Sequence, residues 1–284
     1  MNLPPDIILD VFKYLTIQDI LILTRSNKYF YIIFKTHTRY ICKIIARHDP
    51  LYREYKVAID KNDINRIQIL YYNNNNNIDI LDETGETPLM YSLVHGTPDI
   101  TNKILDLNPD VNIQENDGET ALMYAIESST SRIINRILDL GGNINLHSNR
   151  SAIPLFLAFK HSTSQIINRM LDLTSDINIK NKYNTTSLMC ALKNNTPKII
   201  HRMLDLNPDV NIQNYFGGTA LMFALVYCTP EIINRILDMG ANINRIDTND
   251  NTPLRLAKTY STPDIIKRIE NIVYNTNILT SFKI

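Results

Sequence analysis

The chain has 284 residues, of which 44% are hydrophobic and 20% are charged, a composition typical of a folded protein rather than of a disordered or membrane-embedded one. Lysine plus arginine and aspartate plus glutamate both number 29, so the zero net charge favours neither nucleic acid nor an anionic membrane as a partner. The sequence offers no long apolar run and no basic stretch before an apolar N-terminal segment. We therefore expect an intracellular protein.

Residues 1–48 have the pattern of three short amphipathic helices. Pro4 and Pro5 open the first, Thr16 with Asp19 can cap the second, and Ser26 can cap the third. The apolar residues of the first two recur at helical spacing on one face. They are Ile7, Ile8, Val11, Phe12, Leu15 and Ile20.

An internal repeat governs the rest of the chain, with a period of 33 residues and no insertion or deletion. Segments such as TPLM and TALM begin at Thr87, Thr120, Ile153, Thr186, Thr219 and Thr252. Two residues after each start stands a leucine: Leu89, Leu122, Leu155, Leu188, Leu221 and Leu254. We expect six repeats over residues 82–276, the last a cap, with a tail over 277–284. Residues 49–81 are expected to form a degenerate first repeat, an N-terminal cap with an Asn-rich insertion.

Each repeat contains signals for two helices and a turn. Ten residues after each start comes a threonine, often followed by proline as in Thr97–Pro98, and we expect its hydroxyl to cap a second, longer helix. An asparagine column then precedes a polar stretch such as Gln114–Glu119, which favours a β-hairpin finger. No such unit can close a core alone, so neighbours must stack.

A period of 33 with T-P-L near the start of the first helix resembles the ankyrin repeat. The resemblance implies an α-rich repeat solenoid of stacked helix pairs with short β-hairpin fingers, preceded by the small three-helix module. The histidine that usually follows T-P-L is replaced here, and we expect apolar contact instead of its hydrogen bonds. The replacing residues are Met90, Met123, Phe156, Met189, Met222 and Arg255.

The string LPPDIILDVFKYLTIQDILIL resembles an F-box. That resemblance implies docking onto the Skp-type adaptor of a cullin-RING ubiquitin ligase, with the rest of the chain holding a target protein. The expected adaptor-binding residues are Leu3, Pro4, Ile7, Ile8, Val11, Phe12, Leu15 and Ile20. The combination is also similar to the F-box/ankyrin proteins of giant DNA viruses, which implies a host cytoplasm or nucleus.

Motifs for catalysis, cofactors or metals are not found, so we predict no enzyme, no cofactor and no metal. Cys42, Cys190 and Cys228 are widely spaced, which predicts reduced thiols. A recurrent cation such as Arg136 precedes an aspartate by three residues, and we expect a solvated face of pairs within each helix. The chain also holds 34 Asn, a bias that we attribute to an AT-rich coding genome.

The resemblance to ankyrin proteins places the finger tips and the outer part of each first helix on one target-binding face. The expected target-binding residues are Glu83, Glu86, Asp117, Glu119, Glu127, Arg150, Lys160, Lys182, Tyr183, Lys193, Tyr215, Phe216 and Tyr227. We expect the aromatic residues to anchor the target and the charges to orient it. The alternatives are tyrosines that merely pack on the next repeat, and a plain ankyrin scaffold or inhibitor whose N-terminal helices only seal the first repeat.

Overall fold

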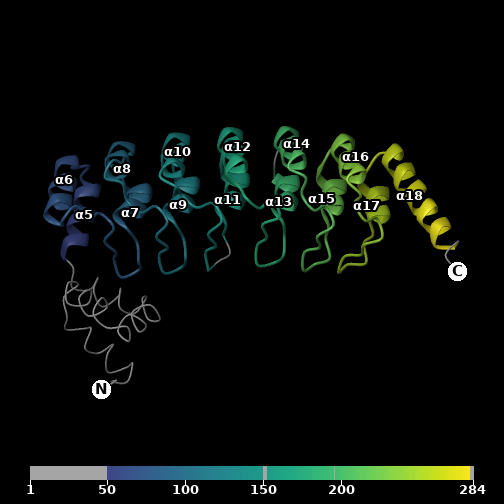
Figure 1. Cartoon of the computed structure of the whole chain (residues 1–284), viewed down its shortest axis with the longest axis horizontal. Helices are drawn as coiled ribbons and strands as arrows, with labels where there is room; N and C mark the ends of the chain where they lie inside the picture. Colours follow the sequence, from purple (N-terminus) through teal and green to yellow (C-terminus); the bar gives the residue numbers. More distant parts are fainter. Residues whose placement is uncertain (1–49, 150–151, 195, 282–284) are drawn as a thin grey trace, which may run out of the picture. The chain divides into compact units, whose positions relative to one another are not determined.

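The computed structural model describes residues 50–149, 152–194 and 196–281, so the three helices expected within residues 1–48 lie outside the described part of the chain. The described residues form helices α5 to α18 and no β-strand (Figure 1). They belong to two compact units that divide after Arg150, called unit one and unit two below. Within each unit the helices alternate between an inner and an outer row.

Unit one contains three described helix pairs. The helices are α5 (Pro50–Asp60), α6 (Ile64–Asn73), α7 (Pro88–His95), α8 (Pro98–Leu105), α9 (Ala121–Ser128) and α10 (Ser131–Asp139). Helices α5, α7 and α9 pack side by side as one row, and α6, α8 and α10 form the other.

Unit two contains four pairs built in the same way. The helices are α11 (Pro154–His161), α12 (Ser164–Leu173), α13 (Ser187–Asn194), α14 (Pro197–Asp205), α15 (Ala220–Tyr227), α16 (Pro230–Asp238), α17 (Pro253–Tyr260) and α18 (Pro263–Ser281). Neighbouring first helices pack on one another, as do neighbouring second helices. The fold is therefore the stacked helix-pair architecture expected from the repeat.

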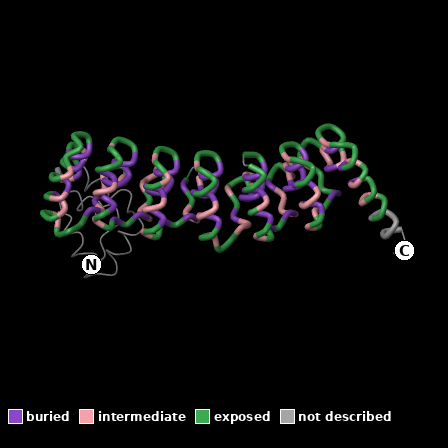
Figure 2. The backbone as a smooth tube through the Cα atoms, turned by 90° about the horizontal axis from the view of Figure 1, so that it is seen from above, coloured by how far each residue is buried: buried purple, intermediate pink, exposed green. Residues whose placement is uncertain are grey.

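The core of each unit lies between neighbouring helix pairs. Figure 2 shows buried positions recurring in pair after pair. The leucine column is buried from Leu89 to Leu221, with Leu221 fully inaccessible. The residues that replace the usual histidine are buried too, including Met90 and Met189, while Arg255 is exposed. Apolar contact therefore takes the place of the histidine's hydrogen bonds, as expected.

The helix starts follow the Thr-Pro pattern, but the threonine hydroxyls do not all cap. The Thr97 Oγ1 accepts from the Ile100 amide at 3.4 Å, whereas Thr196 and Thr229 make no side-chain cap bond. The threonine before a first helix does cap in α7, where the Thr87 Oγ1 lies 3.2 Å from the Met90 amide. Because proline has a fixed φ and no amide hydrogen to satisfy, it starts a helix without a hydroxyl cap. The expectation that every second helix is hydroxyl-capped is wrong.

The fingers are compact turns rather than β-hairpins. In the 82–86 finger the Asp82 amide donates to the Glu86 carbonyl at 3.1 Å, and the Asp82 side chain accepts from the amides of Thr84 and Glu86. A side-chain oxygen that closes the loop in this way leaves no room for a strand ladder. Among the described residues the one β-feature is an isolated antiparallel bridge between Lys180 and Thr186. The expected hairpin fingers are corrected accordingly.

The asparagine column hydrogen-bonds each repeat to the next. The Asn112 Oδ1 accepts from the Asn143 amide at 2.7 Å, and its Nδ2 donates to the Gly141 carbonyl at 3.0 Å. Asn211 makes the same two bonds to the following repeat, through the Asn242 amide and the Gly240 carbonyl. These asparagines serve a structural purpose, so coding bias alone does not account for them.

The arginines also connect repeats. The Arg136 Nη2 lies 2.5 Å from the Asp106 Oδ1 of the preceding repeat, and its Nη1 donates to the Asn102 carbonyl at 3.0 Å. Arg268 contacts Asp238 and the Asn234 carbonyl in the same manner. A guanidinium fork can serve a carboxylate and a carbonyl of one helix end at the same time, and a cation is favourable there. The predicted pairing within each helix is replaced by pairing across repeats.

The last helix pair has one uncovered side. Leu254 is only partly buried, Arg255 and Glu270 are exposed, and the Lys258 Nζ pairs with the Glu270 Oε1 at 3.1 Å. Helix α18 continues to Ser281, beyond residue 276 where the sixth repeat was expected to end.

A leucine of the core should matter more to stability than a helix cap. We expect Leu155→Ala to lower the free energy of unfolding by about 2 to 5 kcal/mol, because the Leu155 side chain is buried and leaves a cavity. Thr163→Ala should lower it by about 1 kcal/mol or less, because the cap bond to the Ile166 amide is long, at 3.5 Å. Denaturant melts of the two variants measure both; the reverse order would contradict the core assignment.

An asparagine of the connecting column should contribute measurably although it is not buried. Asn211→Ala removes two bonds between repeats and should lower the free energy of unfolding by about 1 to 2 kcal/mol. Asn249→Ala, at an exposed finger tip, is the matched control and should change it by less than about 0.5 kcal/mol. Equal losses in the two variants would refute a role for the column.

Candidate protein-binding surface

The expected target-binding residues of unit one lie on two acidic fingers and on α9. Glu83, Asp117 and Glu127 are exposed, while Glu86 and Glu119 are half-buried. The Asn116 Nδ2 donates to the Glu83 carbonyl at 3.1 Å and so ties the second finger to the first. The finger positions follow from the repeat period, which places Glu83 and Asn116 in the same column.

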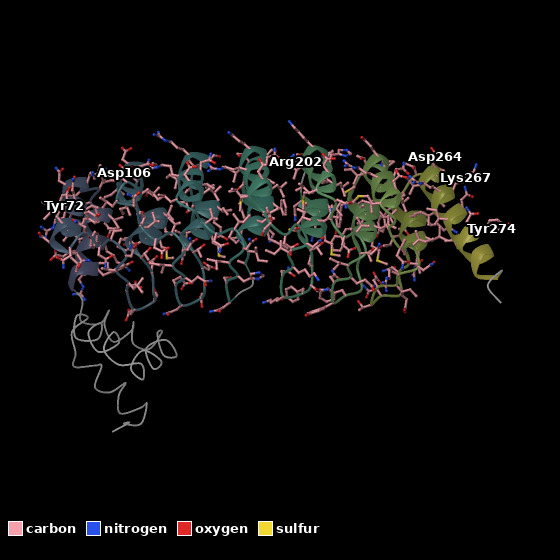
Figure 3. The ribbon with its side chains drawn as sticks, in the orientation of Figure 1. Tyr72, Asp106, Arg202, Asp264, Lys267 and Tyr274 are labelled. Atoms are coloured by element: carbon pink, nitrogen blue, oxygen red, sulfur yellow. The ribbon has the colours of Figure 1, made fainter. Side chains whose placement is uncertain are left out.

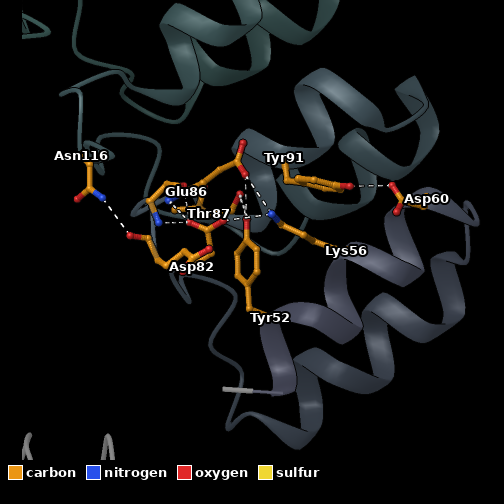
Figure 4. Close-up of polar contacts among 10 residues, drawn as sticks. Tyr52, Lys56, Asp60, Asp82, Glu86, Thr87, Tyr91 and Asn116 are labelled. Atoms are coloured by element: carbon orange, nitrogen blue, oxygen red, sulfur yellow. Dashed lines mark hydrogen bonds and ion pairs between the residues drawn. The ribbon is translucent and has the colours of Figure 1, made fainter. Parts of the chain in front are cut away.

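Glu86 belongs to an internal cluster in unit one (Figure 4). Its carboxylate lies 3.7 Å from the Lys56 Nζ and accepts from the Tyr52 hydroxyl at 3.4 Å. The Lys56 Nζ also pairs with Asp82 at 3.1 Å and lies 4.6 Å from the centre of the Tyr91 ring. Burial raises the pKa of the Glu86 carboxyl, although the Lys56 charge opposes that shift. Glu86 thus has partners within the chain already.

Sequence comparison by period did not find this cluster. The helix pair α5–α6 is joined to the following repeat by the Asn-rich stretch, so Lys56 corresponds to Tyr91 at a separation of 35 rather than 33 residues. The signal that could have identified it is the alternation of tyrosine and charge in YREYK, which begins at Tyr52.

The aromatic target-binding residues of unit two are exposed. Exposure is 72% for Tyr215, 58% for Phe216, 52% for Tyr227 and 47% for Tyr183. The rings of Tyr183 and Phe216 contact one another, with centroids 6.3 Å apart. The alternative of tyrosines buried against the next repeat does not fit these exposed fractions. Arg150 lies outside the described residues.

The lysines of this region lie against the aromatic rings. The Lys182 Nζ is 5.2 Å from the centre of the Tyr183 ring, and the Lys193 Nζ is 6.0 Å from that of Tyr227. Lys160 is exposed on α11. Basic and aromatic groups therefore share one surface in unit two. We define the lysine-aromatic surface as Lys160, Lys182, Tyr183, Lys193, Tyr215, Phe216 and Tyr227.

Phe223 joins the finger part of this surface to the helix part, and the sequence analysis missed it. Its ring centre lies 6.3 Å from that of Tyr227, and a side-chain carbon at Gly218 would come within 3.2 Å of the Phe223 ring. The available signal was its place in the column of Tyr91 and Tyr124, one position into the solvent-facing side of each first helix.

Backbone contacts hold the fingers of unit two rigidly. The Tyr215 amide donates to the Tyr183 carbonyl at 2.9 Å, and the Thr248 amide donates to the Phe216 carbonyl at 2.9 Å. Gly217 has φ +74, and a Cβ there would lie 2.7 Å from the Asp247 Cα. Only glycine permits both the conformation and the close approach. The neighbouring aromatic side chains are presented from a fixed platform.

Catalytic or metal-binding geometry is not seen in the described part of the chain. It contains no group of three or more histidine, cysteine, aspartate or glutamate side chains that could hold a metal ion. Burial raises the pKa of the Cys228 thiol to about 11 and also raises that of Cys190, so neither is an activated thiolate. None of the described helices is long and apolar enough to cross a membrane.

The expected adaptor-binding residues, from Leu3 to Ile20, lie outside the described residues. Their role is therefore addressed by comparison with known proteins. The family model for the F-box domain matches residues 1–42, and the family model for ankyrin repeats, in three copies, matches residues 56–148 and 155–247. These matches confirm both resemblances seen in the sequence, whereas the similarity to viral proteins stays a prediction.

The fold has a counterpart among solved structures. The chain is similar to the crystal structure of the ankyrin repeat domain of Bcl-3, described as a unique member of the IkappaB protein family, with a TM-score of 0.59. The two are 18% identical over 77% of this chain and 97% of that one, which supports the fold alone. No curated protein matches the chain.

Proposed function

Because the chain belongs to the ankyrin repeat family and carries an F-box domain match before its repeats, we propose that it is the substrate-receptor subunit of a Skp/cullin/F-box-type ubiquitin ligase. Both modules mediate protein-protein interactions, and neither family is enzymatic. The observation that carries the proposal is their succession in one chain, with F-box residues 1–42 followed by a rigid recognition array. The F-box segment binds a Skp-type adaptor, and the array holds the protein to be modified.

The geometry of unit two supports the second half of this proposal. Exposed aromatic rings on a rigid platform are the groups that dominate protein-protein affinity, while charges at the rim steer the approach. Tyr215 and Phe216 are exposed at the tip of a finger held by backbone bonds on both sides. We infer that they anchor the target. The protein acts as a monomer until its partners bind, within the cytoplasm or nucleus of a cell.

A plain scaffold or inhibitor is the rival function, and adaptor capture separates the two. Leu3→Ala with Pro4→Ala should abolish capture of a recombinant Skp-type adaptor by the full chain, because these residues begin the F-box match. Its thermal melt should be unchanged. Adaptor bound equally by the wild type and the double variant, or by neither, would favour the scaffold.

Target capture should depend on the aromatic finger. Tyr215→Ser with Phe216→Ser should weaken capture by about 2 kcal/mol or more, roughly thirtyfold in Kd, with a much smaller loss of folding stability. The matched control is Tyr72→Ser with Tyr274→Ser, since these tyrosines are 61% and 67% exposed and lie on α6 and α18 (Figure 3). The control should capture target normally. The finger variant should still bind the adaptor, which the Leu3 and Pro4 variant should not.

Unchanged capture by the finger variant would show that Tyr215 and Phe216 are not the anchors. A stability loss as large as the binding loss would show instead that these rings are structural.

A further inference from the structure

The lysine-aromatic surface of unit two carries cations without anions. Aspartate and glutamate do not occur in α11, α13 or α15, nor in the stretches 180–186 and 213–219 that precede α13 and α15. The same segments contain four exposed lysines, which are Lys160, Lys180, Lys182 and Lys193. In a chain whose basic and acidic residues are equal in number, this separation is a local property.

These lysines differ from the other cations of unit two. Arg202, Arg235 and Arg268 each pair with an aspartate of the preceding repeat, and Lys258 pairs with Glu270. Within the described residues, no carboxylate lies within ion-pair distance of the four lysines. The described contacts of Lys182 and Lys193 are with the faces of Tyr183 and Tyr227.

The nearest acidic finger does not neutralise the surface. The Asp247 carboxylate accepts from the amides of Asn249 and Asn251, at 2.8 and 2.9 Å, and so is used to close its own turn. These bonds also lower the pKa of Asp247 and keep it charged. A carboxylate that reaches Lys182 or Lys193 must therefore come from another molecule.

We propose that the target engages unit two through an acidic, extended segment that also carries aromatic or large aliphatic side chains. This inference rests on the proposed function, because it names the chemistry of the protein that the array holds. The carboxylates of the segment pair with the ammonium groups, and its apolar side chains pack on Tyr183, Tyr215, Phe216 and Tyr227. An extended segment fits because the surface runs across successive fingers rather than into a closed pocket.

A protein segment fits this surface better than single-stranded nucleic acid. Stacking aromatics with nearby cations are common to both kinds of site, but nucleic-acid channels follow a phosphate backbone with a continuous positive groove. Here the cations are four lysines without arginine, and the following finger contains Asp247 and Asp250. The zero net charge of the chain provides no additional attraction to phosphate.

The test measures binding of the full-length protein by fluorescence anisotropy to three labelled probes: a random copolymer of glutamate and tyrosine, polyglutamate, and oligo(dT). We expect the glutamate-tyrosine copolymer to bind most tightly, because it alone offers carboxylates and aromatic rings together. Lys160→Gln with Lys182→Gln and Lys193→Gln should weaken its binding about tenfold, as expected for the loss of three exposed ion pairs.

The matched control removes the same charge elsewhere. Lys61→Gln with Lys198→Gln and Lys267→Gln changes three exposed lysines outside the surface, of which Lys267 lies on α18 (Figure 3), and should change the affinity by less than about twofold. Circular dichroism melts check that both triple variants are folded.

Three outcomes would overturn the proposal: no binding of the copolymer, equal weakening by the two triple variants, or tighter binding of oligo(dT). None of these outcomes bears on adaptor capture. A receptor that binds its adaptor but not the copolymer would retain the proposed function with a different target chemistry.

Discussion

Each helix pair of this protein can bury its leucines only against the next pair. A pair such as α13–α14 has Leu188 on one side and no second layer of its own, so its apolar surface is covered by neighbours from the adjacent repeats. The polar contacts follow from that requirement. Asparagines such as Asn211 and arginines such as Arg235 link the same neighbours, at the base of the fingers and at the ends of the second helices. Packing and polar bonding therefore fix the spacing between repeats together.

The period made the fold predictable from the sequence, because a residue that recurs every 33 positions must serve the same contact in each repeat. Leu221 and Met222 follow that rule and are buried where it places them. Features within a single repeat were less accessible. The closing of the 82–86 finger depends on one side-chain oxygen, and the absence of a hydroxyl cap at Thr229 depends on its rotamer, neither of which the pattern encodes.

The partners of charged residues were mispredicted for a similar reason. On one helix Arg136 and Asp139 are three residues apart, so the sequence favours a local pair, yet Arg136 contacts Asp106 of the preceding repeat. A contact over 30 residues is visible only once the stacking distance is known. The exposure of Tyr215 was expected from its finger position, but the proximity of Lys182 to Tyr183 and the bridging place of Phe223 required coordinates.

The residues that join the repeats are distinct from those that face outward on the fingers. Leu221, Asn211 and Arg235 hold the neighbours together, while Tyr215 and Phe216 make their described ring contact at the finger tips alone. Mutation can therefore replace what the fingers display while the stack keeps its stability, and selection can act on recognition and on folding separately. A chain built in this way can diverge toward new targets through a few codons, with the scaffold inherited intact.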